Sequence, residues 1–312
     1  MLRIIVCCAG LVLLSVQGFS QQISRFNPDT IRTIVIDSAV TVKANKLNVE
    51  GFINEIISDT SFYKAFRNMK KYNFIAENSI FTYDKNDRVN GRIYRKILHN
   101  PGPPYIKYLA KSDSGKVYKK NGKYQFYTAE MFDYLFMNAY KSDFVPSTAI
   151  DKGETHESYK EKLKTLIFSP GRPVKGIPFI SNKTEIFSAN MRQYYDYRFY
   201  SGTYLDSIPV YRFKATVKPD LSAWTQDGIM IKELTTIFDK RNMQILGRFI
   251  DMKYSNMLFD FDVQMNIELG YFDEVLLPTK VSYQGNWDVP MKKEERASFL
   301  VLQKGYSIIK NN

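Results

Sequence analysis

The amino-acid sequence predicts an α+β fold dominated by an antiparallel β-sheet, and two observations support this class. Apolar residues occupy every second position from Phe259 to Leu269, with polar residues between them. This period of two predicts a strand with one dry face and one wet face. Such alternation is typical of antiparallel sheets, because buried parallel strands are apolar on both faces. Apolar residues at helical spacing occur only in short stretches, within residues 49–69, 128–140 and 155–168.

The first twenty residues have the pattern of a secretory signal. Arg3 provides a positive start, residues 4–14 form an apolar core too short to span a bilayer, and Gly18 and Ser20 place small residues before the expected cleavage site. We therefore expect residues 1–20 to be removed during export by the Sec pathway. Residues 21–48 are then an extended N-terminal segment, with a strand or extended lead-in at 31–42.

Cysteine and charge limit the classes of function. Cys7 and Cys8 both lie in the signal, too close to the start for a lipoprotein signal, so the mature chain has no thiol chemistry and no disulfide. Without Arg3, 43 basic and 32 acidic residues remain, a formal net charge of +11. In an exported protein we expect no nucleic-acid partner. The charge favours anionic lipid head groups, lipopolysaccharide or acidic polysaccharide, or it serves solubility alone.

The helical stretches have recognisable ends. Residues 49–69 are interrupted at Ser58-Asp59-Thr60-Ser61, which offers a new N-cap and predicts two short helices or one kinked helix. Thr128 is expected to cap a helix that runs to about Tyr140, with Phe132 and Phe136 on one side. A third helix, 155–168, should end at Pro170-Gly171. Residues 142–154 are the best candidate for a subdomain boundary within a single domain of residues 49–312.

Extended stretches separated by turn residues make up most of the remaining chain. Asn121-Gly122 is the strongest hairpin signal, because both residues accept a positive φ at little cost. Pro278 cannot donate to a ladder, so its strand is an edge or is bulged there. The expected strands are residues 73–83, 89–98, 105–110, 116–119, 123–127, 191–199, 210–218, the meander of 229–287, and 297–308.

The final meander suggests a specific register. Lys240-Arg241-Asn242 and Tyr254-Ser255-Asn256 resemble three-residue hairpin loops with Asn in the left-handed position. The second loop would place Phe249 opposite Phe261 and Ile245 opposite Met265 on one face, with Arg248 opposite Asp262 on the other. A two-residue loop would instead place Asp251 opposite Asp260, which is unfavourable.

Residues 92–127 form a basic and aromatic segment. It holds nine basic residues and one acid, Asp113, interleaved with six tyrosines. Lysines could contact phosphates while tyrosines lie at a membrane interface, so this segment is a candidate head-group or glycan contact. The alternative is a wet sheet face on which lysines protect the edge. The residues selected for such a contact are Lys116, Lys119, Lys120 and Lys123.

Catalytic constellations are scarce. The two histidines, His99 and His156, have no cysteine or second histidine near them in sequence, so we expect no metal site, and no nucleophile motif accompanies them. Asp260, Asp262 and Glu268 share one strand face and could act as paired carboxylates in glycoside hydrolysis. Strand alternation alone explains these three positions, so we expect no enzymatic activity and no cofactor.

The order of elements resembles the Lol-type lipoprotein carriers and their half-barrel relatives. An N-terminal helix, antiparallel strands, a helical insertion and a long meander cover roughly residues 49–308, and Leu277-Pro278 entering the strand 279–283 is similar to that family's late strands. The chain is longer than a typical carrier. The resemblance implies a strongly curved sheet, a half-barrel, whose concave face packs on a few helices and holds acyl chains in an apolar space.

On this resemblance the chain is a non-enzymatic protein of a Gram-negative envelope, in the periplasm or at the periplasmic face of the outer membrane. It would bind a lipid, an acyl chain or a lipidated partner. The alternative is a structural or interaction module of an envelope complex that contacts protein or anionic glycan. The residues expected to line the apolar space are Phe259, Phe261, Val263, Met265, Ile267, Phe132 and Phe136.

Overall fold

The computed structural model describes residues 40–42, 49–140, 144, 159–172, 181–205, 207–255, 260–288 and 293–308. These residues form an 11-stranded sheet in the order β1-β5-β6-β7-β8-β9-β10-β11-β2-β3-β4, in which every neighbouring pair is antiparallel. The strands are β1 (Val40–Val42), β2 (Asn73–Tyr83), β3 (Val89–His99), β4 (Ile106–Gly115), β5 (Tyr195–Tyr204), β6 (Ile208–Val217), β7 (Ile231–Asp239), β8 (Ile245–Ser255), β9 (Asp260–Phe272), β10 (Val275–Asp288) and β11 (Glu295–Ser307).

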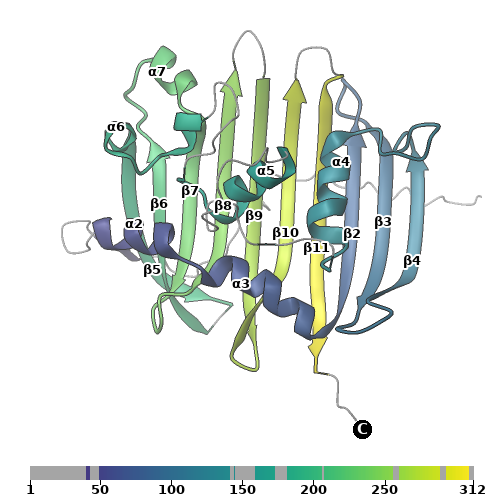
Figure 1. The fold of residues 1–312 in the computed structure, drawn as a ribbon. Helices are drawn as coiled ribbons and strands as arrows, with labels where there is room; N and C mark the ends of the chain where they lie inside the picture. Colours follow the sequence, from purple (N-terminus) through teal and green to yellow (C-terminus); the bar gives the residue numbers. More distant parts are fainter. Residues whose placement is uncertain are drawn as a thin grey trace, which may run out of the picture.

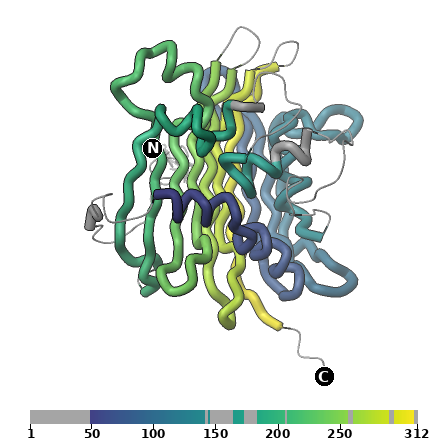
Figure 2. The backbone as a smooth tube through the Cα atoms, turned by 60° about the vertical axis from the view of Figure 1, so that its left-hand side comes forward, coloured from purple at the N-terminus to yellow at the C-terminus, as the bar shows by residue number. Residues whose placement is uncertain are grey.

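Helices cover one face of this sheet, and the sheet curves around them (Figures 1 and 2). The α-helices are α2 (Val49–Ser58), α3 (Ser61–Asn68), α4 (Tyr127–Phe132), α5 (Tyr159–Phe168), α6 (Ala189–Arg192) and α7 (Ala223–Gly228). Shorter turns are the 3-10 helices η2 (Met69–Lys71) and η5 (Ser181–Thr184), and the π-helix η3 (Asp133–Met137) continues α4. The predicted fold class, a curved antiparallel sheet with a few helices on its concave face, is confirmed.

Bulges contribute to the curvature. The register shifts at Pro278/Lys280 between β9 and β10, at Thr82/Tyr83 between β2 and β3, and at Lys96/Ile97 between β3 and β4. A bulge bends its strand and increases the local right-handed twist. Of the two predictions for Pro278 the bulge is confirmed, because β10 lies inside the sheet between β9 and β11.

The two strand groups join through a pair that is distant in sequence. β5 to β11 follow one another as a meander, and β11 then pairs with β2, with Phe299 opposite Ile80 and Val301 opposite Asn78. The predicted boundary at 142–154 lies outside the described residues apart from Phe144, which is buried.

The N-terminal helical stretch divides as predicted. α2 ends at Ser58 and α3 begins at Ser61, because Asp59 accepts hydrogen bonds from the backbone N–H of Ser61 and of Phe62, each at 3.0 Å. This side chain satisfies donors that the first turn of a helix leaves unpaired.

The predicted cap of α4 is wrong. The Thr128 side chain caps no helix; instead Glu295, at the start of β11, accepts from the backbone N–H of Tyr127 at 2.7 Å and of Thr128 at 3.0 Å, and from the Thr128 hydroxyl at 3.1 Å. A carboxylate from a distant strand therefore satisfies the helix N-terminus, where negative charge is favourable.

Several turns also differ from prediction. Met243, not Asn242, takes the left-handed conformation (φ 58°) in the β7–β8 hairpin, and the strand expected at 105–110 extends to Gly115 as β4. The hairpin predicted at Asn121-Gly122 is confirmed by the antiparallel bridge between Tyr118 and Tyr124, although 116–119 and 123–127 are not continuous strands. Only Gly122 of the Asn121-Gly122 pair has a positive φ (76°). The stretch predicted as a strand from Met191 begins as α6.

The predicted register between β8 and β9 is wrong, and this error changes the face of the sheet on which Arg248 lies. Ser255 pairs with Asp260 and Lys253 with Asp262, so Arg248 lies opposite Ile267 and Phe249 opposite Asn266. The predicted pairing differs from this one by an odd number of residues. Because side chains alternate with a period of two, such a slip moves every side chain of β8 to the other face.

Candidate functional site

The residues predicted to line an apolar interior lie on the helix-facing side of β9. Phe261, Val263, Met265 and Ile267 are all buried, whereas Phe259 lies outside the described residues. Phe261 stacks on Trp287 of β10 with ring centroids 5.1 Å apart, and it lies 6.1 Å from the ring of Tyr254.

The two helix residues expected to line the same apolar space contact β11 instead of β9. Phe132 and Phe136 pack on Phe299 of β11, with centroid separations of 4.2 and 5.8 Å. Phe299 stacks in turn on Tyr283 of β10, which lies opposite Met265 of β9. The structure therefore connects the two predicted sets through Tyr283 and Phe299.

At the middle of this apolar face lies an arginine that sequence reasoning placed on the opposite side. Arg248 is 2% exposed, and its guanidinium carbon lies 4.4 Å from the ring centroid of Phe62 in α3. Its Nη1 donates to the carbonyl oxygen of Phe168, at the end of α5, at 3.1 Å. Its Nε has no acceptor among the described residues. Burial lowers the pKa of Arg248 to about 10, against an opposing effect of the Asp59 carboxylate.

A second buried polar group adjoins Arg248. Thr236 of β7 lies directly opposite Arg248, is 0% exposed, and its hydroxyl has no partner in the described part of the chain. Unsatisfied buried donors are uncommon and require an explanation. One feature of the sequence indicates that β8 is buried: Ile245, Leu246, Phe249 and Ile250 make it apolar on both faces. For the same reason, the alternation of apolar and polar residues could not assign the Arg248 side chain to one face.

The basic and aromatic segment separates into paired and unpaired charges. Arg95 is buried and forms a two-point ion pair with Asp113 at 2.5 and 2.8 Å, and its Nη2 also donates to the Tyr118 hydroxyl at 3.1 Å. Lys96 pairs with Glu77 at 3.2 Å. The predicted contacts Lys116, Lys119, Lys120 and Lys123 are all exposed.

The acidic face of β9 is occupied by ion pairs. Asp262 pairs with Lys253 at 3.2 Å, and Glu268 pairs with Lys280 at 3.0 Å and accepts from Asn266 at 2.8 Å. The Asp262–Lys253 pair is solvated, whereas Glu268 is only 18% exposed and lies beside the buried Asn266. Within the described residues, no group of three or more His, Cys, Asp or Glu is arranged to hold a metal ion.

His99 is enclosed by aromatic rings. It is 0% exposed, stacks on Phe74 at 4.3 Å, and lies 6.0 Å from the ring of Tyr140. Neither ring nitrogen has a hydrogen-bond partner among the described residues, and burial lowers the pKa of His99 to about 4. This environment is that of a neutral core histidine.

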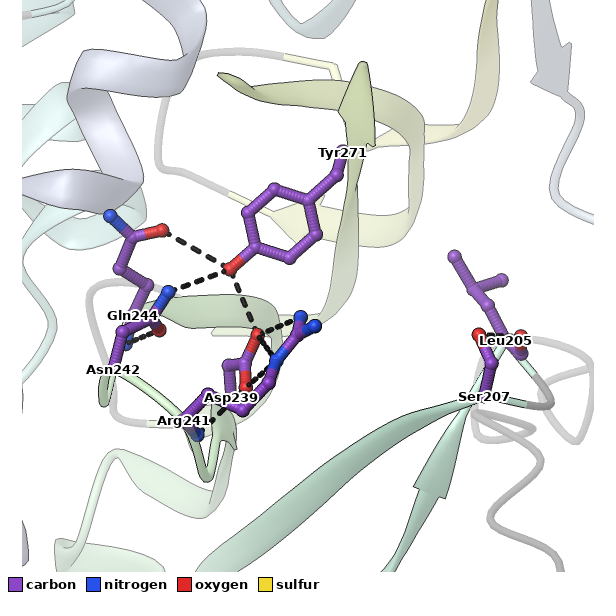
Figure 3. Close-up of polar contacts among 7 residues, drawn as sticks. All are labelled: Leu205, Ser207, Asp239, Arg241, Asn242, Gln244 and Tyr271. Atoms are coloured by element: carbon purple, nitrogen blue, oxygen red, sulfur yellow. Dashed lines mark hydrogen bonds and ion pairs between the residues drawn. The ribbon is translucent and has the colours of Figure 1, made fainter. Parts of the chain in front are cut away.

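Another polar cluster, at the β7–β8 hairpin, was not predicted (Figure 3). The buried carboxylate of Asp239 accepts from Arg241 Nη2 at 2.6 Å and from the Tyr271 hydroxyl at 2.9 Å, and that hydroxyl also lies 3.2 Å from both Gln244 Oε1 and Asn242 Nδ2. Burial alone would raise the pKa of Asp239, but the hydrogen bonds from Arg241 and Tyr271 outweigh it and hold the pKa below its usual range.

The Asp239 cluster serves the fold. Every polar side chain in it has a partner, and the cluster ties the hairpin containing the left-handed Met243 to the end of β9. Figure 3 also shows Ser207 donating to the carbonyl oxygen of Leu205 at 3.3 Å, a local turn contact.

Comparison with known proteins adds little. No protein-family profile matches the chain, and no curated protein matches it. Among solved structures it is similar to the crystal structure of a DUF1329 family protein from Desulfovibrio piger, at 9% sequence identity and a TM-score of 0.24, with 85% of this chain and 94% of that chain covered. None of the helices in the described ranges is long and apolar enough to cross a membrane.

Proposed function

We propose that this chain is a non-enzymatic protein of the cell envelope that binds a lipid, an acyl chain or a lipidated partner between the curved sheet and its helices. The observation that carries the proposal is the environment of Arg248. A guanidinium buried among aromatic side chains, with an unpaired Nε, supports a site for an apolar ligand that bears an anionic head. Ligand sites are typically apolar with a few placed polar groups of this kind.

Two further features support the proposal. Phe261, Val263, Met265 and Ile267 provide an apolar strand face beneath the helices. The architectural resemblance to the Lol-type carriers and the secretory pattern of residues 1–20 agree with a periplasmic carrier or receptor.

A second candidate is an interaction module of an envelope complex. Direct aromatic contact between α4 and the sheet, with Phe132 and Phe299 centroids 4.2 Å apart, favours it, because a filled core leaves less space for a ligand. In that case the exposed edges of the sheet would contact protein or glycan.

The first experiment is mass spectrometry of an organic extract from protein purified gently from its native envelope. A stoichiometric lipid or acyl species supports the carrier proposal. An empty extract from well-folded protein, together with no binding of the fatty-acid probe described next, favours the interaction module.

A matched pair of variants tests the role of Arg248. We expect Arg248→Met to lower affinity for a fluorescent fatty acid by about 10–100-fold, the value of a lost charged hydrogen bond, and to leave binding of the corresponding fatty alcohol unchanged. Arg212→Met is the control, because Arg212 lies on the opposite face of the same sheet, opposite Ile237. Equal losses for the acid and the alcohol would contradict a head-group role.

Phe261→Asp tests the apolar face separately. The substitution places a charge on the buried face of β9 and should abolish binding of both probes in a protein that remains folded by circular dichroism. Full binding by the folded variant would contradict an apolar site on this strand.

A further inference from the structure

Exposed apolar side chains gather at one edge of the sheet. Tyr105, Tyr108, Leu109 and Tyr118 are 47, 53, 45 and 36% exposed, and Val89, at the adjacent start of β3, is 46% exposed. β4 is the edge strand of the sheet, and the connection to α4 begins at the end of β4, at this edge (Figure 1). Exposed apolar groups that cluster in this way usually mark an interaction surface.

The same edge carries unpaired positive charge. Its exposed lysines have no ion-pair partner within the described ranges, and the one acid of the segment, Asp113, is already bound by Arg95. These residues are Lys107 and Lys111 of β4, and Lys116, Lys119, Lys120 and Lys123 of the following hairpin.

Local contacts hold this surface in a defined shape. The Arg95–Asp113 pair and the Arg95–Tyr118 hydrogen bond anchor the hairpin to β3, and the rings of Tyr118 and Tyr124 lie 5.2 Å apart. Val117 is buried against Gly91, where a Cβ atom would approach a Val117 methyl group to 2.8 Å. The lysines are therefore displayed on an ordered hairpin.

We propose that the β4 edge and its hairpin, residues 105–123, dock the protein on an anionic lipid bilayer. Lysines bind lipid phosphates, and the tyrosines and Leu109 enter the interface, where amphipathic rings are favoured. This docking surface is distinct from the interior site proposed above and does not depend on it.

Two observations disfavour other occupants of this edge. In a two-fold pairing of β4 with a second copy centred on Leu109, Lys107 would face Lys111, and like charges directly opposite are destabilising. An added strand from another protein would meet the register shift at Lys96/Ile97, which places Leu109 in a bulge and interrupts the regular ladder.

Vesicle co-sedimentation of the full mature chain tests the proposal. We expect binding to mixed vesicles of phosphatidylcholine and the anionic lipid phosphatidylglycerol, loss of binding at high salt, and no binding to vesicles of phosphatidylcholine alone. Replacing Lys116, Lys119, Lys120 and Lys123 by Gln should lower the partition coefficient at least about 100-fold, because each lysine near an anionic surface contributes about fivefold.

The control replaces four exposed lysines elsewhere, Lys64, Lys71, Lys253 and Lys304, by Gln and so removes the same net charge. It should retain most of the wild-type binding. Equal losses in both variants would show a general charge effect and overturn the proposal.

A second variant tests the aromatic part of the surface. Tyr105→Ser with Tyr108→Ser, which keeps all lysines, should weaken binding to anionic vesicles about 10-fold or more, by removing rings that partition into the interface. The proposal is also overturned if wild-type protein binds no vesicle, which would favour a protein partner, or if the hairpin variant binds as wild type does.

Discussion

At the scale of single residues, burial determines the ionisation of two polar side chains in this protein. His99 and Arg248 are both polar, both buried and both incompletely hydrogen-bonded, and burial lowers the pKa of each. His99 remains neutral at physiological pH, whereas Arg248 keeps its charge within an apolar layer. The first is therefore a source of pH dependence, and the second is a candidate ligand contact.

The pH dependence of stability follows from His99. Its pKa is about 4 in the folded protein and about 6.5 when unfolded, so the unfolded chain binds more protons as pH falls through this window. The titration of His99 should lower the free energy of unfolding of the wild-type chain by about 2 kcal/mol between pH 7.5 and pH 5, and we expect His99→Phe to abolish this decrease. Urea titrations at the two pH values measure it.

Urea titrations of the wild-type chain at the same two pH values provide the reference for this prediction. If His99→Phe loses as much stability as wild type between pH 7.5 and pH 5, His99 is not the titrating group.

At the scale of elements, contacts across the fold complete what local sequence begins. α3 is capped by Asp59, two residues before its start, which a local motif predicts. α4 is capped by Glu295, 168 positions away from Tyr127, which no local motif indicates.

Loss of the Glu295 cap should destabilise the folded protein. Glu295→Gln should lower the free energy of unfolding by about 1–2 kcal/mol, because one amide oxygen replaces two carboxylate oxygens and the favourable negative charge is lost. Urea unfolding measures the effect. Glu294→Gln, which removes only an ion pair with Arg296, should cost less than about 1 kcal/mol; equal costs would contradict the capping role.

At the scale of the whole molecule, the pairing of β11 with β2 joins the meander to the first strand group. Val301, at this junction, is 0% exposed and lies between Val281 of β10 and Asn78 of β2. A continuous sheet of this kind favours cooperative unfolding.

We therefore predict one unfolding transition for the chain. Val301→Ala should lower the free energy of unfolding by about 2 kcal/mol, through loss of buried methyl groups, and should shift tryptophan fluorescence and far-UV circular dichroism together. Leu302→Ala, on the opposite face, should have a smaller effect. Separate transitions for the two probes would instead indicate a subdomain boundary, as considered for residues 142–154.

Much of the local structure was predictable from sequence. Both ends of β2 agree with the prediction, the helix break at Asp59 is confirmed, and the alternation of β9 correctly assigned Phe261 to Ile267 to a buried face. These features depend on side-chain period and turn chemistry within a few residues.

The sequence by itself therefore determined the antiparallel sheet, the buried face of β9 and the basic segment. The tertiary structure alone decided that β11 lies beside β2, that Glu295 caps α4, and that Arg248 faces the helices. The physical reason is that strand order and register depend on pairs distant in sequence. For Arg248, β8 is apolar on both faces, so only the observed pairing with Ile267 could assign its side chain to the interior.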